Sequence, residues 1–256
     1  NDIDGHNIIL KNGERISAKV IVGCGGPHDP LRKKFWKEKS LNITVNFVLM
    51  DGDFDDRVDL YFGSTAPGGY AWMIPKDGGA NIGIGISGKY SKHKSAKKLL
   101  DEFMLREYPN AAIHTTMCGG VPCGKPMRNP VQNGLMLVGD AAHQINPMTG
   151  GGIVSGMKAG WIAGQVAAEA IKKEDYSINI LNNYSDSMWK AFGKNYERFY
   201  RIKEAVHNLS DEDLNHIYEK ILSIPVDKRR LSSVFKAAVF KKPALIVDVL
   251  KVFVGV

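Results

Sequence analysis

The sequence of 256 residues contains three cysteines, an odd number that no disulfide framework uses completely. The spacing in Cys118-Gly-Gly-Val-Pro-Cys123 fits neither a redox pair nor a zinc site, and Cys24 lies far from both in the sequence. Unpaired thiols are typical of a reducing compartment. The polar, acidic start Asn1-Asp-Ile-Asp is no secretory signal, so we expect a cytoplasmic protein.

The sequence also lacks a long uninterrupted apolar run. In the apolar stretch 152–173, the pattern is broken by Lys158, Gln165 and Glu169, whereas a membrane-spanning helix needs about 20 predominantly apolar residues. We therefore predict a helix at 152–173 that packs against a sheet. Its glycines recur every fourth residue, and we expect them to form the smooth face that makes this contact.

A metal site is not expected either. The acidic run 51–59 resembles a calcium loop, but its sixth place is not glycine and Phe62 stands at the twelfth place, where glutamate is needed. We predict a solvated hairpin turn there. The net charge of +7 favours anionic partners such as phosphates or an acidic membrane surface, and no basic-aromatic module for nucleic acid is present.

The most informative string runs from Gly134-Leu-Met-Leu-Val-Gly-Asp-Ala-Ala-His143 to Pro147-Met-Thr-Gly-Gly-Gly-Ile153. The apolar run 135–138 predicts a strand buried on both faces. Gly139 permits a turn that leaves Asp140 at the carboxyl end of this strand, where open α/β sheets bind ligands. Three glycines then open a helix whose free N–H groups and dipole would face a flat or anionic ligand. Without a ligand, the same string is a glycine-rich connection between a strand and a helix.

This string resembles the second FAD-contacting motif of flavoproteins with the para-hydroxybenzoate hydroxylase fold, and most of all that of the geranylgeranyl reductase family, which saturates isoprenoid double bonds. The resemblance implies a set of FAD-contacting residues: Gly139, Asp140, Pro147, Thr149, Gly150, Gly151, Gly152 and Ile153. It implies that Asp140 accepts a hydrogen bond from the ribityl or pyrophosphate region. It also implies that the N–H groups at 151–153 stabilise negative charge on the reduced flavin.

A second string, Gly69-Tyr-Ala-Trp-Met-Ile-Pro-Lys76 followed by Gly83-Ile-Gly85, resembles the Tyr-x-Trp-x-Phe-Pro … Gly-x-Gly signature of the same family, with isoleucine in place of Phe. Alternation along a strand puts Tyr70 and Trp72 on one face. The resemblance implies that they line, with Pro75, the pocket of an isoprenoid lipid substrate. By pattern alone, they are equally well aromatic core residues of an ordinary strand.

The resemblance is incomplete near the start of the chain. These flavoproteins begin with a strand-Gly-x-Gly-x-x-Gly-helix unit that holds the FAD pyrophosphate, and Gly23-Cys-Gly-Gly26 does not have that spacing. Gly25 also stands where the family has the Asp of an Asp-Gly pair, with Arg32 as the equivalent of the arginine that follows. We therefore expect the C-terminal part of such a protein, which by itself binds FAD weakly or not at all.

The predicted fold class is α/β (α+β), with a partial FAD-binding domain of the para-hydroxybenzoate hydroxylase type, a β-sheet substrate domain and C-terminal helices. Residues 1–40 and 110–182 are assigned to the remnant of the FAD-binding domain, 41–109 to the β-rich substrate domain and 183–256 to the helical region. The expected elements are a hairpin around Asn12-Gly13, strands at 20–26, 43–50, 58–62, 70–74, 81–86 and 113–121, and helices at 94–108, 152–173, 210–222, 231–240 and 244–254.

The resemblance implies an FAD-dependent oxidoreductase of phospholipid metabolism that saturates geranylgeranyl double bonds, with a peripheral place at the membrane. Flavin supplies the hydride chemistry in such enzymes. The electron donor is not identified, and Tyr70 and His143 are candidate proton donors, although His143 is better explained as structural. Two alternatives stay open. A flavin monooxygenase is disfavoured because the glycine run ends in Ile153 rather than in asparagine; the other is a truncated, non-catalytic chain that binds lipid or a partner.

Overall fold

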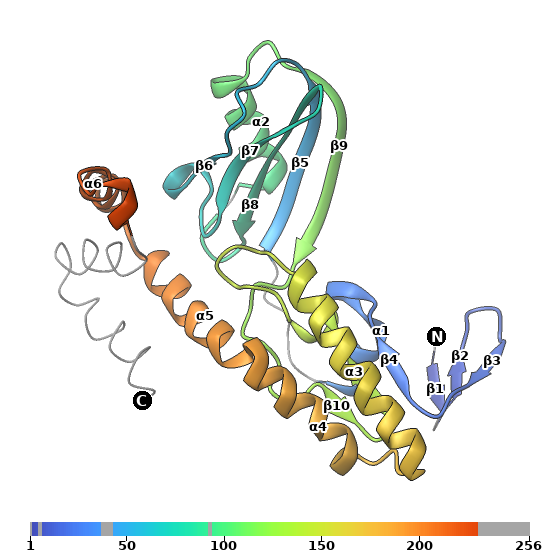
Figure 1. Ribbon diagram of the computed structural model, residues 1–256. Helices are drawn as coiled ribbons and strands as arrows, with labels where there is room; N and C mark the ends of the chain where they lie inside the picture. The colour runs from blue at the N-terminus through green and yellow to red at the C-terminus, as the bar shows by residue number, and fades with distance from the viewer. Residues whose placement is uncertain (1, 5–6, 37–42, 92–93, 230–256) are drawn as a thin grey trace. The chain divides into compact units, whose positions relative to one another are not determined.

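The computed structural model describes residues 2–4, 7–36, 43–91 and 94–229, and Figure 1 shows their helices and strands. The chain divides into two compact units: residues 1–42 with 122–200, and residues 43–121 with 201–256. The mixed α/β class predicted from the sequence is confirmed. The two helices predicted after residue 230 lie outside the described residues.

The first unit is built on a small sheet in the order β10-β11-β4. The strands β4 (Ile21–Gly23) and β11 (Leu135–Leu137) run parallel, and β10 (Val131–Gln132) pairs antiparallel with β11. All three residues of β11 are buried, as predicted for a strand covered on both faces. In β4, the side chain of Val22 is 40% exposed, so only one face of this strand is covered.

A second, antiparallel sheet of the first unit contains β1 (Asp2–Asp4), β2 (Asn7–Ile9) and β3 (Arg15–Ser17). The predicted hairpin is confirmed, because β2 pairs with β3 and Gly13 in the turn between them has φ +86°. Short helical segments of this unit are η1 (Gly26–His28), α1 (Pro30–Phe35) and η3 (Gly139–Ala142).

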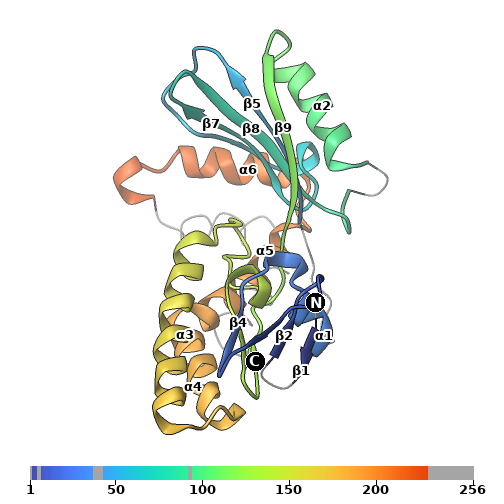
Figure 2. The same ribbon diagram turned by 90° about the vertical axis from the view of Figure 1, so that its right-hand side faces the viewer.

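The longer helices of the first unit pack beside its parallel strands. They are α3 (Ile153–Lys173), α4 (Ile178–Met188) and a π-helical turn (Trp189–Gly193) that continues into α5 (Lys194–Val206). Only the part of α5 up to Tyr200 belongs to this unit. Helices α3 and α4 lie side by side, as Figures 1 and 2 both show. Their shared core includes Ala163 of α3, Leu181 of α4 and Met136 of β11.

The expectation that the glycine face of α3 makes this contact was wrong. Gly160 and Gly164 are exposed, whereas Ala159, Ile162 and Val166 are buried against the sheet and α4. The reason is that alanine and branched side chains remove more apolar area from water than glycine does, so the helix turns that face inward. None of the helices within the described residues is long and apolar enough to cross a membrane.

The second unit is a five-stranded antiparallel sheet in the order β6-β7-β8-β5-β9. Its strands are β5 (Ile43–Asp51), β6 (Asp59–Tyr61), β7 (Tyr70–Lys76), β8 (Gly79–Ser87) and β9 (Ala112–Val121). All five predicted strands are present. β9 pairs with β5 along its length, which places residues 112–121 in this unit, whereas the sequence assigned them to the cofactor-binding part.

The sequence led us to expect a hairpin turn at the acidic run 51–59, and this expectation was wrong. The run connects β5 to β6, and these strands are not neighbours because β8 and β7 lie between them. Its charges nevertheless face solvent, and within the described residues no group of acidic, His or Cys side chains is arranged to hold a metal ion.

Helix α2 (Ala96–Glu107) covers one face of the five-stranded sheet. The predicted apolar stripe of Leu99, Leu100, Phe103 and Met104 is buried there. Three further elements belong to this unit: η2 (Gly63–Thr65) before β7, and α6 (Asp211–Leu222) and η5 (Val226–Lys228) near the end of the described chain. The capping box that starts α6 has Ser210 as its N-cap, as predicted.

Candidate functional site

The turn after β11 takes the form that the sequence predicted. Gly139 has φ +68°, a left-handed conformation, and a Cβ added there would meet no atom within 4 Å. The turn is closed by Gln144, whose Oε1 accepts from the Gly139 N–H at 2.8 Å and whose own N–H donates to the Gly139 carbonyl at 3.0 Å. Asp140 therefore stands just beyond the strand, half-buried. Burial raises the pKa of its carboxyl above the ordinary value.

A buried hydrogen-bond network fixes this turn to the rest of the first unit. The Gln144 Nε2 donates to the Tyr184 hydroxyl at 2.6 Å, and that hydroxyl donates to the Leu137 carbonyl at 2.9 Å. Both side chains are fully buried. Helix α4 thereby holds the end of β11 and the turn that follows it. Neither residue was singled out from the sequence, because 40 positions separate them and only the fold brings them together.

Replacing Tyr184 with phenylalanine is expected to lower the free energy of unfolding by about 1–3 kcal/mol, because the Leu137 carbonyl and the Gln144 amide would be left buried without this partner. Denaturant unfolding measures the loss. Tyr196→Phe is the matched control in the same unit, since the ring of Tyr196 packs half-buried against Phe192 and Phe199. Equal stability of both variants would show that the network does not hold the turn.

The glycine run forms an ordered loop rather than a loose connection. The Asn146 N–H donates to the Gly151 carbonyl at 2.9 Å, and the Gly150 N–H donates to the Asn146 carbonyl at 2.8 Å. Gly150 has φ +71°. Thr149 accepts from the Gly151 N–H at 3.2 Å and is exposed, whereas Pro147 is buried beneath the loop. All predicted residues of the string are thus brought together with Asp140 in the first unit.

The loop opens directly into the N-terminus of α3. Gly152 is the N-cap, and no side chain caps this end of the helix, so the N–H groups of its first turn have no intrahelical acceptor. A Cβ on Gly152 would lie 3.3 Å from an Asp140 carboxylate oxygen, which places that carboxylate against the helix start. Ile153 is 82% exposed. An exposed, uncapped helix start directly after three residues without side chains fits the phosphate or ring edge of a dinucleotide cofactor.

His143 is turned into the core instead of toward this loop. It has φ +53°, is 3% exposed, and its Nδ1 lies 3.3 Å from the Lys125 carbonyl. Within the described part of the chain, its buried Nε2 has no hydrogen-bond partner. Burial first, and then the charge of Arg32, lower the pKa of His143 to about 4. A buried imidazole that is uncharged at neutral pH supports the structural interpretation.

This buried imidazole predicts acid sensitivity. The unfolded state, with the ordinary histidine pKa of 6.5, binds a proton more readily than the folded state does, so His143 contributes stability above pH 6.5 that is lost as the pH falls toward 4. The loss amounts to roughly 3 kcal/mol. His143→Asn, which tolerates the left-handed backbone, is expected to flatten the dependence in denaturant unfolding between pH 7 and pH 4.5. An unchanged slope would contradict the assignment.

The turn after β4, where Gly25 replaces the Asp of the family pattern, is held by the side chain of Asp29. Asp29 is buried; its carboxylate caps α1 by accepting from the N–H groups of Leu31 and Arg32, at 2.8 and 3.0 Å, and also accepts from the Gly25 N–H at 2.7 Å. Asp29 was missed from the sequence, although Asp before Pro is a recognised helix start. The guanidinium of Arg32 is buried and donates to the Pro27 carbonyl.

In the second unit, strand β7 carries the predicted aromatic pair on one face. Ala71 and Met73 belong to the core under α2, so Tyr70 and Trp72 lie half-buried on the opposite face. Their ring centroids are 5.8 Å apart. The interpretation that these rings fill the core of the sheet is therefore wrong. Pro75 is the second-to-last residue of the same strand, opposite Ala80.

The glycines of the motif make room for the ring of Trp72. Tyr70 pairs with Gly85 and Trp72 pairs with Gly83 on β8. A Cβ on Gly83 would lie 2.3 Å from Cζ2 of Trp72, so the indole covers a position that only glycine leaves open. The Trp72 Nε1 donates to the Asn81 Oδ1 at 2.7 Å, which fixes the tilt of the ring. The sequence indicated both halves of the motif but not this cross-strand contact.

Comparison with known proteins supports the same interpretation. Residues 40–121, which include the whole sheet of the second unit, match the family model described as "Geranylgeranyl reductase catalytic domain". The predicted family resemblance is confirmed. Among curated members with digeranylgeranylglycerophospholipid reductase names, the chain is 35% identical to that of Methanothrix thermoacetophila over 90% of its residues. It is 36% identical to reductase 1 of Methanococcoides burtonii over 88% of its residues.

Solved structures of the geranylgeranyl reductase type and of other flavin enzymes share the fold. A "geranylgeranyl bacteriochlorophyll reductase-like" protein from Thermoplasma acidophilum matches with a TM-score of 0.81 and 29% identity, over 94% of this chain and 64% of that one. A flavin-dependent halogenase matches with a TM-score of 0.60 and 14% identity, over 95% of this chain and 54% of that one. The chain spans 61% of the Methanothrix relative and 57% of the Methanococcoides relative.

Proposed function

We propose that this chain provides the substrate unit and part of the cofactor site of an FAD-dependent reductase that saturates isoprenoid double bonds of membrane lipids. The observation that carries the proposal is the geometry of the two motifs: an uncapped helix start directly after a run of three glycines, and a strand whose Trp72 ring lies over Gly83. The helix start lies in the first unit and the aromatic strand lies in the second. The names of the relatives support the digeranylgeranyl glycerophospholipid class as the substrate.

In this proposal, FAD supplies hydride chemistry when bound, and the chain positions it. The open N–H groups at 152–153 and the dipole of α3 favour negative charge at the loop. Asp140 accepts a hydrogen bond from a cofactor hydroxyl. Gly139, Pro147, Thr149, Gly150 and Gly151 shape the loop around it. Tyr70, Trp72 and Pro75 line the path of the apolar chain.

The test uses the protein with excess FAD, a chemical reductant and a geranylgeranyl phospholipid. Flavin occupancy is read first from the visible absorbance of the protein, and the lipid is then analysed by mass spectrometry. We expect products heavier by one H₂ for each reduced double bond. Incorporation of oxygen would favour the monooxygenase alternative. Unchanged lipid in the presence of bound flavin would favour a non-catalytic lipid-binding chain.

A further inference from the structure

Gln144 is fully buried in the segment between Asp140 and the glycine loop, and it forms hydrogen bonds through both its side chain and its backbone. Two of these bonds join it to the Gly139 N–H and carbonyl groups, so it closes the turn that carries Asp140. A third bond runs from its Nε2 to the Tyr184 hydroxyl on α4. A side chain buried in this way acts on a ligand only through the residues that it holds.

A fourth hydrogen bond joins Gln144 to the start of α3. The Ser155 Oγ donates to the Gln144 carbonyl at 2.5 Å and also lies 3.1 Å from the Gly152 carbonyl. Ser155 is the third residue of α3 and is 4% exposed, so this bond forms inside the first turn, whose N–H groups have no intrahelical acceptor. Gln144 therefore links two pieces of chain, the Asp140 turn and the free N–H groups of α3.

The bonding partners fix the orientation of the Gln144 amide. An N–H group can only donate, so the Gly139 N–H must face the amide oxygen, and the amide nitrogen must face Tyr184. The Tyr184 hydroxyl accepts from this nitrogen and gives its own proton to the Leu137 carbonyl at 2.9 Å. The side chain at position 144 must thus accept on one side and donate on the other, which an apolar side chain cannot do.

The two pieces that Gln144 links lie next to each other at the proposed cofactor site. A Cβ on Gly152 would lie 3.3 Å from an Asp140 carboxylate oxygen, so the carboxylate and the helix start are neighbours. The position of this carboxylate depends on the backbone of its turn, which Gln144 closes at both Gly139 groups. A ligand gains affinity when its contacts are held in place before it binds, because less ordering is then required.

We propose that Gln144 is a positioning residue, which sets the separation between the Asp140 carboxylate and the first turn of α3 so that one ligand meets both. That this ligand is FAD rests on the proposed function. The separation itself is a property of the chain without a ligand, and it is measured separately. Ser155 and Tyr184 share the role, since they anchor Gln144 to α3 and α4.

Ser155→Ala is the most selective test, because it cuts the link to α3 and leaves the side-chain bonds of Gln144 in place. Burial raises the pKa of Asp140, and we expect the variant to shift this pKa down toward the ordinary 3.8 as water enters between the carboxylate and the helix. NMR of the Asp140 carboxyl carbon measures the shift in the folded protein without FAD. The affinity for FAD, followed by the amide resonances of residues 150–153, should fall about tenfold.

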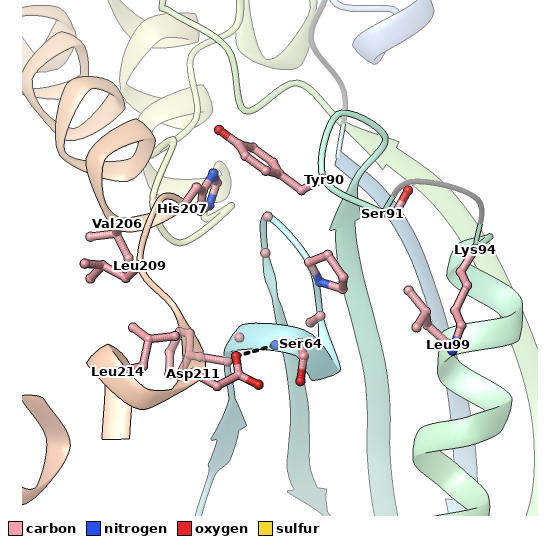
Figure 3. Close-up of a pocket in the computed structure, with 16 residues that line it drawn as sticks. Ser64, Tyr90, Ser91, Lys94, Leu99, Val206, His207, Leu209, Asp211 and Leu214 are labelled. Carbon is pink, nitrogen blue, oxygen red and sulfur yellow. Dashed lines mark hydrogen bonds between the residues drawn. The ribbon is translucent and has the colours of Figure 1, made fainter. Parts of the chain in front are cut away.

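Ser185→Ala is the matched control in the same unit. Ser185 is also a buried helix serine, but its Oγ has no hydrogen-bond partner among the described residues, so neither the Asp140 pKa nor the affinity for FAD should change. A second control lies beside the cavity shown in Figure 3, where the Ser64 N–H donates to an Asp211 carboxylate oxygen at 2.8 Å. Asp211→Asn weakens this bond in the other unit and should likewise leave the Asp140 pKa unchanged.

Gln144→Met is a second variant, which removes both side-chain bonds while keeping a side chain of similar length. The Gly139 N–H loses its acceptor, so its exchange with solvent deuterium should become about tenfold faster. The loss of FAD affinity should not add to that of Ser155→Ala, because both variants release the same separation.

Equal effects of Ser155→Ala and Ser185→Ala, or additive losses of affinity in the double variant, would overturn the positioning role. An Asp140 pKa that shifts as expected, in a protein whose resonances do not respond to FAD, would contradict only the proposed function. FAD binding at the parental affinity in both Ser155→Ala and Gln144→Met would contradict only the positioning role.

Discussion

Replacing Gly152 with alanine is expected to reduce the affinity for FAD about tenfold, or about 1.4 kcal/mol. The added Cβ would lie 2.7 Å from Cγ2 of Ile145, which is 1% exposed and has no room to retreat. The same Cβ would lie 3.3 Å from the Asp140 carboxylate. The loop must shift at the point where the helix presents its free N–H groups, so both proposed cofactor contacts are disturbed together. Titration of FAD followed by visible absorbance measures the change.

Gly164→Ala is the matched control, because it makes the same chemical change on the same helix. Gly164 is exposed in the interior of α3, and a Cβ there would meet nothing within 4 Å. Alanine is the better helix former by roughly 1 kcal/mol, so this variant should unfold at a slightly higher temperature and bind FAD like the parent. If both variants bind FAD alike, the start of α3 does not hold the cofactor.

The features that the sequence predicted well depend on neighbouring residues. The hairpin at Asn12-Gly13 needs only a turn with positive φ, and the connection from β11 to α3 needs only glycines where side chains would obstruct. The apolar stripe of α2 is likewise a local repeat. Such signals act within a few residues of one another, so one sequence is enough to identify them.

The features that it missed depend on which strands and helices meet. The Gln144–Tyr184 hydrogen bond links a turn to α4 and follows no spacing rule. The segment 51–59 has the composition of a hairpin turn, yet β5 lies in the middle of the sheet and pairs with β8 and β9. The glycines of α3 suggested a packing face, but the alanine side buries more area. In each case, tertiary pairing decided between two locally acceptable arrangements.

The Tyr-x-Trp and Gly-x-Gly halves of the second motif depend both on a local sequence pattern and on the pairing of two strands. Alternation places Tyr70 and Trp72 on one face from sequence alone. Only the register of β7 against β8 shows that each aromatic residue pairs with a glycine. The spacing between the two halves is therefore explained by the tight turn at Asp77-Gly78, which sets that register.

Gly83→Ala is consequently expected to displace the indole of Trp72 and to raise the KM for an isoprenoid lipid severalfold, with FAD affinity unchanged. The new Cβ would lie 2.3 Å from Cζ2 of Trp72 and 2.5 Å from Cβ of Phe47, which is too near the backbone to move aside. Overpacking of this kind costs about 1–3 kcal/mol of unfolding free energy. Denaturant unfolding and the indole N–H resonance of Trp72, now bonded to Asn81, report both effects.

Gly119→Ala on β9 separates this steric effect from a general response of the sheet to an added methyl group. It lies in the same sheet, and a Cβ there would meet nothing within 4 Å, so stability, the Trp72 resonance and KM should remain those of the parent. If Gly83→Ala shifts the resonance but leaves KM unchanged, Trp72 does not line the substrate path. If KM rises in both variants, the sheet rather than the ring controls binding. A KM effect confined to Gly83 would assign the glycine–tryptophan contact a direct part in shaping the lipid site.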